Sequence, residues 1–456
     1  MSRDWRAFDE HVQQRAEPYL ADLVDLCRQP SVSSSGEGIQ PMAARVAELF
    51  SRAGAEVEVL AAENAPYPAV LGTFGHGPYT LLLYDHYDVQ PVEPLDAWHT
   101  APFEPLLRDG VLYGRGVADD KGELLARVQA LTAYQAVFGE LPIQVKLLAE
   151  GAHEIGSRGL EQIVTAHRDT LRADACVSEG LGRDEQDNLT VHLGCRGFAY
   201  LELVVQQRDQ VHASMFGGLL PNPGWRLVQA LSTLADANGD LTLDGLDAHV
   251  PAPSAEDLTM LARLPLDEAR LLASLQTREF AAGRSGLPLL QRYLLEPYWT
   301  ITALQSGDPE WGLKLPGRAV ARLDLRLVPN LNPRLVTDLL RAHLEHRGFA
   351  DVQVRLLSGV APDRCPSNAP IARAAVDAAR DLSGLEPAVY PIMPAYSASD
   401  VFHRILGTPV IFAGAVTHAA SNLHAANENI RVTDYLAAIK YLGRLIQRLS
   451  AIAPSA

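Results

Sequence analysis

Residues 79–88 read YTLLLYDHYD, a short apolar run that leads directly into acidic and imidazole side chains. An apolar run of this length, bounded by polar residues, is typical of a buried strand. In open parallel sheets, ligands bind just beyond the carboxyl ends of the strands. The stretch therefore predicts a central strand over Tyr79–Tyr84 and a site at its end that uses His86.

Two further apolar runs also end in side chains that can bind a metal. Ile143–Leu148 leads to His153 and Glu154, and Ala175–Ser178 leads to Glu179. A single such residue after a strand usually belongs to a turn, but three clusters after three strands are hard to explain as turns. We therefore expect the three clusters to share one edge of a parallel sheet.

The N-terminal part of the chain alternates strand-like and helix-like segments. This alternation predicts an α/β fold with a mainly parallel sheet and helices on both faces. The remaining expected elements are strands over Glu56–Leu60 and Pro409–Ala413, helices over Ala7–Cys27, Gln40–Ala53 and Ile371–Leu382, and a helix over Gly122–Phe138 that Asp120 can cap.

The pattern changes between residues 193 and 361. Strand-like segments (Phe198–Gln206, Ala319–Leu327, Val352–Leu357) flank helix-like ones (Trp225–Ala235, Pro333–His346). This is typical of an antiparallel sheet backed by helices. Since 456 residues exceed one ordinary core, we predict a catalytic domain formed by residues 1–192 and 362–456, with an inserted α+β lid and dimerisation domain formed by residues 193–361.

Composition restricts the partners and the compartment. A formal net charge of −16 argues against nucleic acid and anionic membrane surfaces as partners. No segment has the length of a membrane span, and the charged N-terminal region lacks the apolar core of a signal peptide. The four cysteines show no CxxC spacing. We expect a cytoplasmic protein that acts on a small molecule.

Five motifs follow one another in the order of a known family. They are YDHYDVQP at 84–91, LYGRGVADDKG at 112–122, EGAHEIGS at 150–157, Ser178-Glu179, and HAANE at 424–428. Together they resemble the di-zinc metallopeptidase family that includes carnosinases, aminoacylases and carboxypeptidase G. In the predicted inserted domain, the segments 211–218, 221–223, 306–307 and 326–330 are similar to the carnosinase-type lid.

The resemblance implies a site for two divalent metal ions, zinc first, with manganese or cobalt as alternatives. His86 and Glu179 would bind one ion, Glu154 and His424 would bind the other, and Asp119 would bridge them. Imidazole and carboxylate ligands together suit zinc and similar ions, and a shared carboxylate can join two of them.

Metal chemistry alone suggests that Asp88, two residues after His86, would orient the His86 ring. The resemblance implies further roles around the metals. His212 would reach a reacting carbonyl oxygen, across a homodimer formed through the inserted domain, and Arg326 would pair with a substrate carboxylate. Ser399 is a substrate-binding candidate because residues 395–400 replace a glycine-rich substrate loop. Without the motifs, His212 would be interpreted as a lid-surface histidine and Arg326 as a strand residue with a structural carboxylate partner.

The third motif departs from the family at its catalytic position. The family has two adjacent glutamates, of which the first is the general base and the second binds metal. This chain has His153 first and Glu154 second. Asp85 also stands where glycine is usual, and Ala425 where a small hydroxyl residue is usual. Because every metal ligand is kept, we expect metal binding with an altered substrate or reaction.

Two functions remain open. The favoured one is hydrolysis of a C–N bond, in an amide or related group of a small carboxylate-bearing substrate, with water activated by the two metals and protons handled by His153 or by the metal site alone. The alternative is a metal-bearing binding or regulatory protein without turnover. The sequence leaves the substrate open between a dipeptide, an N-acyl amino acid and a non-peptide amine.

Overall fold

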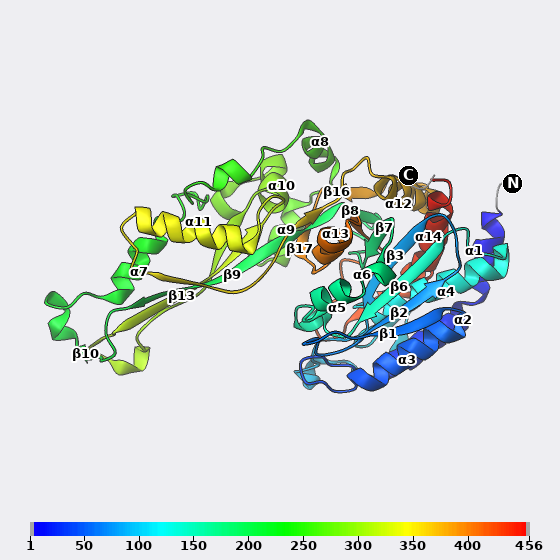
Figure 1. Ribbon diagram of the computed structural model, residues 1–456, viewed down its shortest axis with the longest axis horizontal. Helices are drawn as coiled ribbons and strands as arrows, with labels where there is room; N and C mark the ends of the chain where they lie inside the picture. Colours follow the sequence, from blue (N-terminus) through cyan, green and yellow to red (C-terminus); the bar gives the residue numbers. More distant parts are fainter. Residues whose placement is uncertain (1–3, 453–456) are drawn as a thin grey trace. The chain divides into compact units, whose positions relative to one another are not determined.

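The computed structural model describes residues 4–452, which form two compact units (Figure 1). The first unit comprises the described residues of Met1–Gly194, Arg364–Tyr390 and Val401–Ala456, and the second comprises Cys195–Asp363 and Pro391–Asp400. The second unit thus includes a segment near residue 395 in addition to the central stretch of the chain. This segment belongs there because strand β17 (Met393–Tyr396) pairs with β9 (Gly194–Gln206).

The first unit is built on a sheet of eight strands among the described residues, in the order β1-β2-β6-β3-β7-β18-β8-β16. Its central strands β6, β3, β7 and β18 run parallel, whereas β2 and β8 run antiparallel to their inner neighbours. The α/β class with a mainly parallel sheet is confirmed. The strands are β1 (Glu56–Leu60), β2 (Ala69–Phe74), β3 (Thr80–His86), β6 (Gln144–Glu150), β7 (Ala175–Ser178), β8 (Thr190–His192), β16 (Ala388–Tyr390) and β18 (Val410–Ala413).

Strand β2 was not expected from the sequence. Gly72 in its middle weakens the strand pattern, since glycine lowers strand propensity. In the structure, a Cβ at this position would lie 2.7 Å from the ring of Phe50, so glycine allows helix α3 (Ile39–Arg52) to pack closely on the sheet.

Helices cover this sheet (Figure 1). The expected single helix over Ala7–Cys27 is wrong: the chain turns at Arg15, and the two resulting helices each bury their own apolar side chains. Asp120 stands at the N-cap of α4 but makes no side-chain cap; its carboxylate accepts the His86 backbone N–H at 3.2 Å instead. The helices are α1 (Trp5–Gln14), α2 (Ala16–Arg28), α3 (Ile39–Arg52), α4 (Lys121–Phe138), α5 (Leu160–Ala166), α6 (Arg168–Leu171), α12 (Pro370–Ser383), α13 (Asp400–Leu406) and α14 (Val432–Leu449).

Three short strands complete the first unit. They form a small antiparallel sheet in the order β19-β5-β4, from β4 (Leu106–Arg108), β5 (Val111–Tyr113) and β19 (Asn429–Arg431). No helix among residues 4–452 is both long enough and apolar enough to cross a bilayer. The four cysteines are all buried as thiols.

The second unit is an α+β structure. Its main sheet has the order β11-β13-β9-β14, and these strands are antiparallel. Alternate side chains of β9 and β13 face the helix α11, as in Leu201, Leu323 and Leu340 of its buried core. The elements are β11 (Tyr298–Ser306), β13 (Arg318–Leu327), β14 (Gln353–Val360), β15 (Asp363–Arg364), the pair β10 (His212–Ala213) and β12 (Lys314–Leu315), and helices α7 (Pro223–Leu231), α8 (Ala255–Arg263), α9 (Glu268–Ser274), α10 (Gly286–Leu295) and α11 (Pro333–His346).

His192 makes the first unit sensitive to acid. Its ring stacks on Tyr390 at 4.7 Å, its side chain is 2% exposed, and Nδ1 has no hydrogen-bond partner among the described residues. Burial lowers the pKa of His192 to about 3. In the unfolded chain this imidazole has an ordinary pKa of about 6.5. Between pH 6.5 and about pH 3 the unfolded state therefore binds a proton that the folded state does not, and the free energy of unfolding falls by about 1.4 kcal/mol per pH unit.

We therefore predict that His192→Phe flattens the decline of the unfolding free energy between pH 6.5 and about pH 4.5. Urea unfolding at several pH values measures this decline. The variant His76→Phe, at an exposed histidine, is the matched control and should show the native decline of the unfolding free energy with falling pH. Equal slopes for the native protein and His192→Phe would contradict the prediction.

Candidate metal centre

The parallel register of the central strands brings three polar clusters to one edge of the sheet. Tyr84 in β3 is paired with Leu148 in β6 and with Ser178 in β7, so the three strands end together. His86 closes β3, the turn His153–Ile155 follows β6, and Glu179 follows β7. The expectation that these clusters share one sheet edge is met.

The side chains at this edge form two groups of possible metal ligands. The donor atoms within each group lie within 4.8 Å of one another. The groups are His86, His153 and Glu179, and Asp119, Glu154 and His424. All five ligands expected from the sequence therefore lie in these groups, and His153 joins the first of them.

Asp119 belongs to the second group and also faces the first. Its Oδ1 is 3.0 Å from His86 Nε2, and its Oδ2 is 2.9 Å from His424 Nε2. Glu154 Oε2 is 3.3 Å from the same His424 nitrogen. A carboxylate with one oxygen facing each group fits the requirement for bridging two cations.

The carboxylates and imidazoles of this centre shift one another's pKa values. Burial raises the pKa of Asp119, but hydrogen bonds from His424 and His86 outweigh burial and hold the pKa well below its usual range. The hydrogen bonds of His424 to Asp119 and Glu154 raise the pKa of His424 to about 10. Two carboxylates therefore face imidazole nitrogens in a mixed nitrogen and oxygen donor set, which suits zinc and related ions.

Glu428 holds the loop that carries Asp119. Its buried carboxylate accepts the backbone N–H groups of Ala118 at 2.8 Å and Asp119 at 3.0 Å, and it pairs with Arg115 at 2.7 Å. The sequence motif contained Glu428, but its contact with Asp119 was not anticipated. The positions lie 309 residues apart, and no local pattern connects them.

Asp88 fixes both His86 and the turn after β6. Its Oδ1 lies 3.3 Å from His86 Nδ1, and its two oxygens accept the backbone N–H groups of His153 at 3.1 Å and Glu154 at 3.0 Å. Burial raises the pKa of Asp88, but the hydrogen bond from His86 and the charge on that ring outweigh burial and lower it. An orienting role for Asp88 is compatible with these contacts.

Gly151 allows the turn after β6 to lie close to the sheet. A Cβ there would lie 2.3 Å from the Tyr87 hydroxyl, which donates to the Pro68 carbonyl at 2.7 Å. Any larger residue would displace Tyr87 or the turn. The sequence Glu150-Gly151 thus places His153 and Glu154 at the sheet edge.

The His153 ring lies between Glu179 and Glu150. Nε2 is 3.2 Å from Glu179 Oε1, and Nδ1 is 3.5 Å from Glu150 Oε1. The ring also stacks on His86, with centroids 4.2 Å apart. Burial lowers the pKa of His153, but the charge of Glu179, with help from Glu150, raises it to about 9. A dication held by the same carboxylates would oppose this rise.

Arg127 compensates for the unusual Asp85. The carboxylate of Asp85 is fully buried, and Arg127 of α4 pairs with it at 3.2 Å. The same guanidinium donates to the carbonyls of Val177 at 3.0 Å and Ser178 at 3.1 Å, at the end of β7. Burial raises the pKa of Asp85 to about 7, and the charge of Arg127 opposes this shift. Asp85 therefore belongs to a buried network beside the metal centre.

The other three candidate residues belong to the second unit. His212 lies in β10 with its ring edge-on to Phe216 at 6.2 Å. Arg326 of β13 pairs through Nε with Asp324 at 3.0 Å and lies over the Tyr396 ring at 5.8 Å. Ser399 is fully buried, and its hydroxyl has no hydrogen-bond partner among the described residues.

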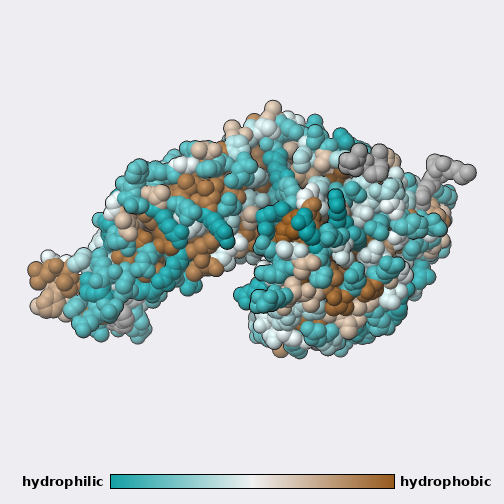
Figure 2. Space-filling view, viewed as in Figure 1, coloured by the Kyte–Doolittle hydropathy of each residue, from teal (hydrophilic) through white to brown (hydrophobic). Residues whose placement is uncertain are grey.

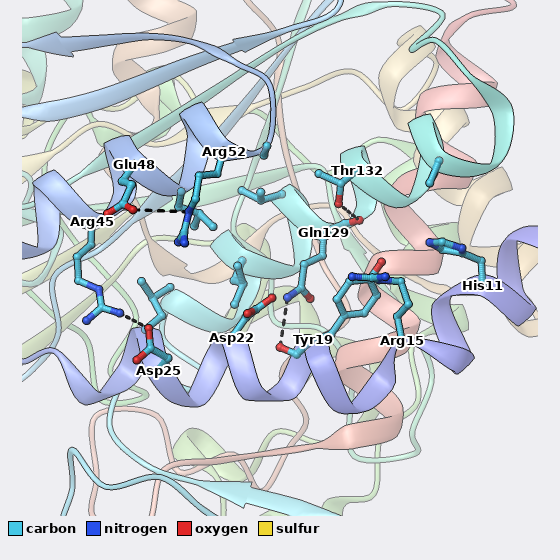
Figure 3. A pocket seen from close by; sticks show the side chains of 16 residues that line it. His11, Arg15, Tyr19, Asp22, Asp25, Arg45, Glu48, Arg52, Gln129 and Thr132 are labelled. Carbon is cyan, nitrogen blue, oxygen red and sulfur yellow. Dashed lines mark hydrogen bonds and ion pairs between the residues drawn. The ribbon is translucent and has the colours of Figure 1, made fainter.

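A hollow of about 800 Å³ in the first unit lies on α2, α3 and α4, away from the metal centre (Figure 3). None of the residues of the two ligand groups lines it. Two ion pairs lie within its lining, Arg45 with Asp25 and Arg52 with Glu48. The Gln129 amide likewise donates to a backbone carbonyl at 3.2 Å. The hollow is therefore separate from the two ligand groups.

Comparison with known proteins agrees with this centre. The profile of peptidase family M20/M25/M40 matches residues 82–448. The chain is 30% identical over 390 residues to the Beta-Ala-His dipeptidase of Homo sapiens, and the match covers 82% of this chain and 76% of that protein. It is 24% identical over 407 residues to the Cys-Gly metallodipeptidase DUG1 of Saccharomyces cerevisiae, covering 84% and 82%.

A solved structure shows the same architecture. The M20 family metallo-carboxypeptidase Sso-CP2 from Sulfolobus solfataricus is 31% identical and superposes with a TM-score of 0.86. The match covers 95% of this chain and 99% of that chain. The three similar proteins carry names with different specificities, a β-Ala-His dipeptidase, a Cys-Gly dipeptidase and a carboxypeptidase.

Proposed function

This chain is a metallohydrolase of peptidase family M20/M25/M40, and on that premise we propose that it hydrolyses a C–N bond in a small substrate that carries a carboxylate. The bond belongs to an amide or a related group. The observation that carries this proposal is the position of Asp119, with one oxygen facing each of two groups of ligand side chains.

The ligand groups would hold two divalent ions. His86 and Glu179 would hold one ion, Glu154 and His424 the other, and Asp119 both. Such a pair of ions activates water and polarises the carbonyl of the bond to be broken. Zinc fits the mixed donor set, and manganese or cobalt are the alternatives.

Two further side chains near the ions would orient a metal ligand and transfer protons. Asp88 orients His86, because a histidine ligand usually donates its outer N–H to a carboxylate or carbonyl. His153 occupies the position of the usual proton-transfer glutamate, and its Nε2 faces Glu179. Its replacement of a glutamate is the reason that we expect a substrate or reaction different from ordinary dipeptide hydrolysis.

The second unit would supply contacts to the substrate. Among the described residues, the Arg326 guanidinium pairs with Asp324 through Nε, so its terminal nitrogens can pair with a substrate carboxylate. His212 would contact the reacting carbonyl oxygen, and Ser399 would donate its hydroxyl to the substrate. The side chain of Ser399 needs such a partner, because a buried hydroxyl without one is unfavourable.

A substrate panel tests the proposed function. We expect purified protein to hydrolyse at least one N-acyl amino acid, dipeptide or related amide, and to lose this activity with a chelator and regain it with zinc, manganese or cobalt. Amides that lack the carboxylate should react more slowly. If no metal-dependent hydrolysis is found, the alternative of a metal-bearing binding protein is favoured. The observation that supports this alternative is His153 at the position of the usual glutamate base.

We also propose that the protein acts on small molecules in a reducing, cytoplasmic compartment. The buried thiols and the net charge of −16 support this proposal. Cysteines persist as thiols where the environment is reducing. The acidic surface is unfavourable for nucleic acid.

The second unit has a surface suited to a second copy of the chain. Strand β11 is an edge strand of its sheet, and Ile301 and Leu304 on it are each 53% exposed. Leu304 lines a hollow of about 310 Å³ with Trp225 and Val228 of α7. Hydrophobic residues also gather at the end of this unit that carries β10 (Figure 2). An edge strand beside an apolar helix face can pair with itself about a two-fold axis.

We therefore predict that the protein is a homodimer and that the double variant Ile301→Lys, Leu304→Lys is a monomer. Each chain of the dimer would then have to bury two lysine side chains without partners, which is unfavourable and would prevent association. Light scattering at micromolar concentration measures the mass. Val59→Lys in β1, the exposed edge strand of the first unit, is the matched control and should leave the dimer intact. A native monomer would refute the dimer.

A further inference from the structure

The two ring nitrogens of His153 face different surroundings. Nε2 is directed to Glu179 Oε1 at 3.2 Å, inside the first ligand group. Nδ1 is directed away from the group, 3.3 Å from the Tyr84 hydroxyl and 3.5 Å from Glu150 Oε1. The ring therefore has one nitrogen inside the metal centre and one outside it.

His86 is arranged in the same way. Its Nε2 faces Asp119 at 3.0 Å and Glu179 at 3.2 Å, while its Nδ1 faces Asp88, with the backbone oxygen at 3.0 Å and the carboxylate at 3.3 Å. In metal sites, a ligating histidine almost always donates its outer N–H to a carboxylate or a carbonyl, which fixes the tautomer and the ring orientation. His153 Nδ1 also has a carboxylate nearby, Glu150 at 3.5 Å, together with the hydroxyls of Tyr84 at 3.3 Å and Ser157 at 3.5 Å.

Glu150 is built into the fold as that outer partner. Its side chain is buried, and its Oε1 accepts the hydroxyls of Tyr84 and Ser157, the latter at 2.6 Å. These donors hold the carboxylate behind the His153 ring. A carboxylate at Nδ1 favours a proton on that nitrogen, which leaves the lone pair of Nε2 directed towards Glu179.

We propose that His153 is a metal ligand through Nε2. This inference rests on the proposed function in that metal ions bind at this centre. The first ion would then have His86, His153, Glu179 and the shared Asp119, whereas the second would keep Asp119, Glu154 and His424. The residue at the usual position of the proton-transfer group would hold a metal instead.

The extra imidazole makes the two metal sites unequal. Structural zinc sites have all four positions filled by protein, and catalytic sites have three protein ligands and an open position. The first ion would therefore bind more tightly, and the open position would belong to the second. A second imidazole also shifts the preference of the first site from manganese towards zinc, cobalt and other late divalent metals.

Cobalt-loaded native protein gives a direct test without any substitution. The exchangeable ring N–H proton of each histidine bound to high-spin Co(II) gives a strongly shifted proton NMR signal. We expect one such signal for each of His86, His153 and His424. Signals from His86 and His424 alone would overturn the proposal.

Zinc titration of metal-free protein against a chromophoric chelator gives the second test. In His153→Gln, we expect the tighter site to weaken by at least ~100-fold, because loss of a ligand exceeds the 10–100-fold cost of losing an outer partner. Glu150→Gln should weaken the same site ~10–100-fold, and it remains informative if His153→Gln fails to fold. The surface variant His167→Gln is the matched control and should keep both affinities.

The outcomes separate this inference from the proposed function. If the native protein binds two ions and hydrolyses an amide, but His153→Gln keeps the tighter site within about threefold of its native affinity, only the ligand role of His153 is overturned. If the native protein binds no ion, both the inference and the proposed function fail.

Discussion

Replacing Asp119 with alanine is expected to abolish hydrolysis and to reduce the metal content from two divalent ions per chain to one or none. Asp119 faces both ligand groups, with its oxygens 3.0 Å from His86 and 2.9 Å from His424. Metal ions contribute several kcal/mol of transition-state stabilisation, so their loss should lower kcat/KM by ~10³-fold or more. Elemental analysis and the rate on the best substrate of the panel measure the two effects.

Asp109→Asn is the matched control for Asp119→Ala. Its carboxylate is 90% exposed, and asparagine tolerates the left-handed backbone found there, with φ at 52°. The control should keep two ions and the native rate. An Asp119→Ala protein that unfolds like the native one and still holds two ions would show that Asp119 does not bridge them. Native protein that holds no ion after reconstitution with zinc or manganese would contradict the metal centre itself.

The sheet that carries the site could be predicted because its signals are local. The apolar runs before His86, His153 and Glu179 are each short enough to be strands, and parallel strands end at one sheet edge. The order of these strands in the sheet does not follow from the runs, because it depends on packing between distant segments. Strand β2 was missed for a related reason: Gly72 is required by the Phe50 ring, which lies in another element.

The ligand groups could be predicted through their motifs, but the contacts that hold them could not. Glu428 supports Asp119 across 309 positions, and Arg127 compensates for Asp85 across 42. Neither pair forms a periodic pattern. The same holds for His153, whose sequence position indicated a lost glutamate base but gave no indication that Glu150 and Glu179 lie on opposite sides of its ring.

His153→Glu is expected to raise kcat/KM on ordinary dipeptides and N-acyl amino acids by ~10²–10⁴-fold, the usual contribution of a positioned general base. A glutamate that accepts a proton becomes neutral, which two neighbouring cations tolerate. A histidine that accepts a proton becomes a cation, which those ions oppose. The native protein should therefore be slow on these substrates.

His153→Gln is the matched control, since glutamine has the shape of glutamate but cannot take up a proton. Assays of the three proteins at saturating zinc, with bound metal measured in each, separate proton transfer from metal loss. A gain in His153→Glu that His153→Gln lacks would show a competent amide hydrolase whose reaction is redirected at one position. If the native protein cleaves dipeptides rapidly and His153→Glu is slower, His153 itself supports that reaction and the expected role of a glutamate at this position is wrong.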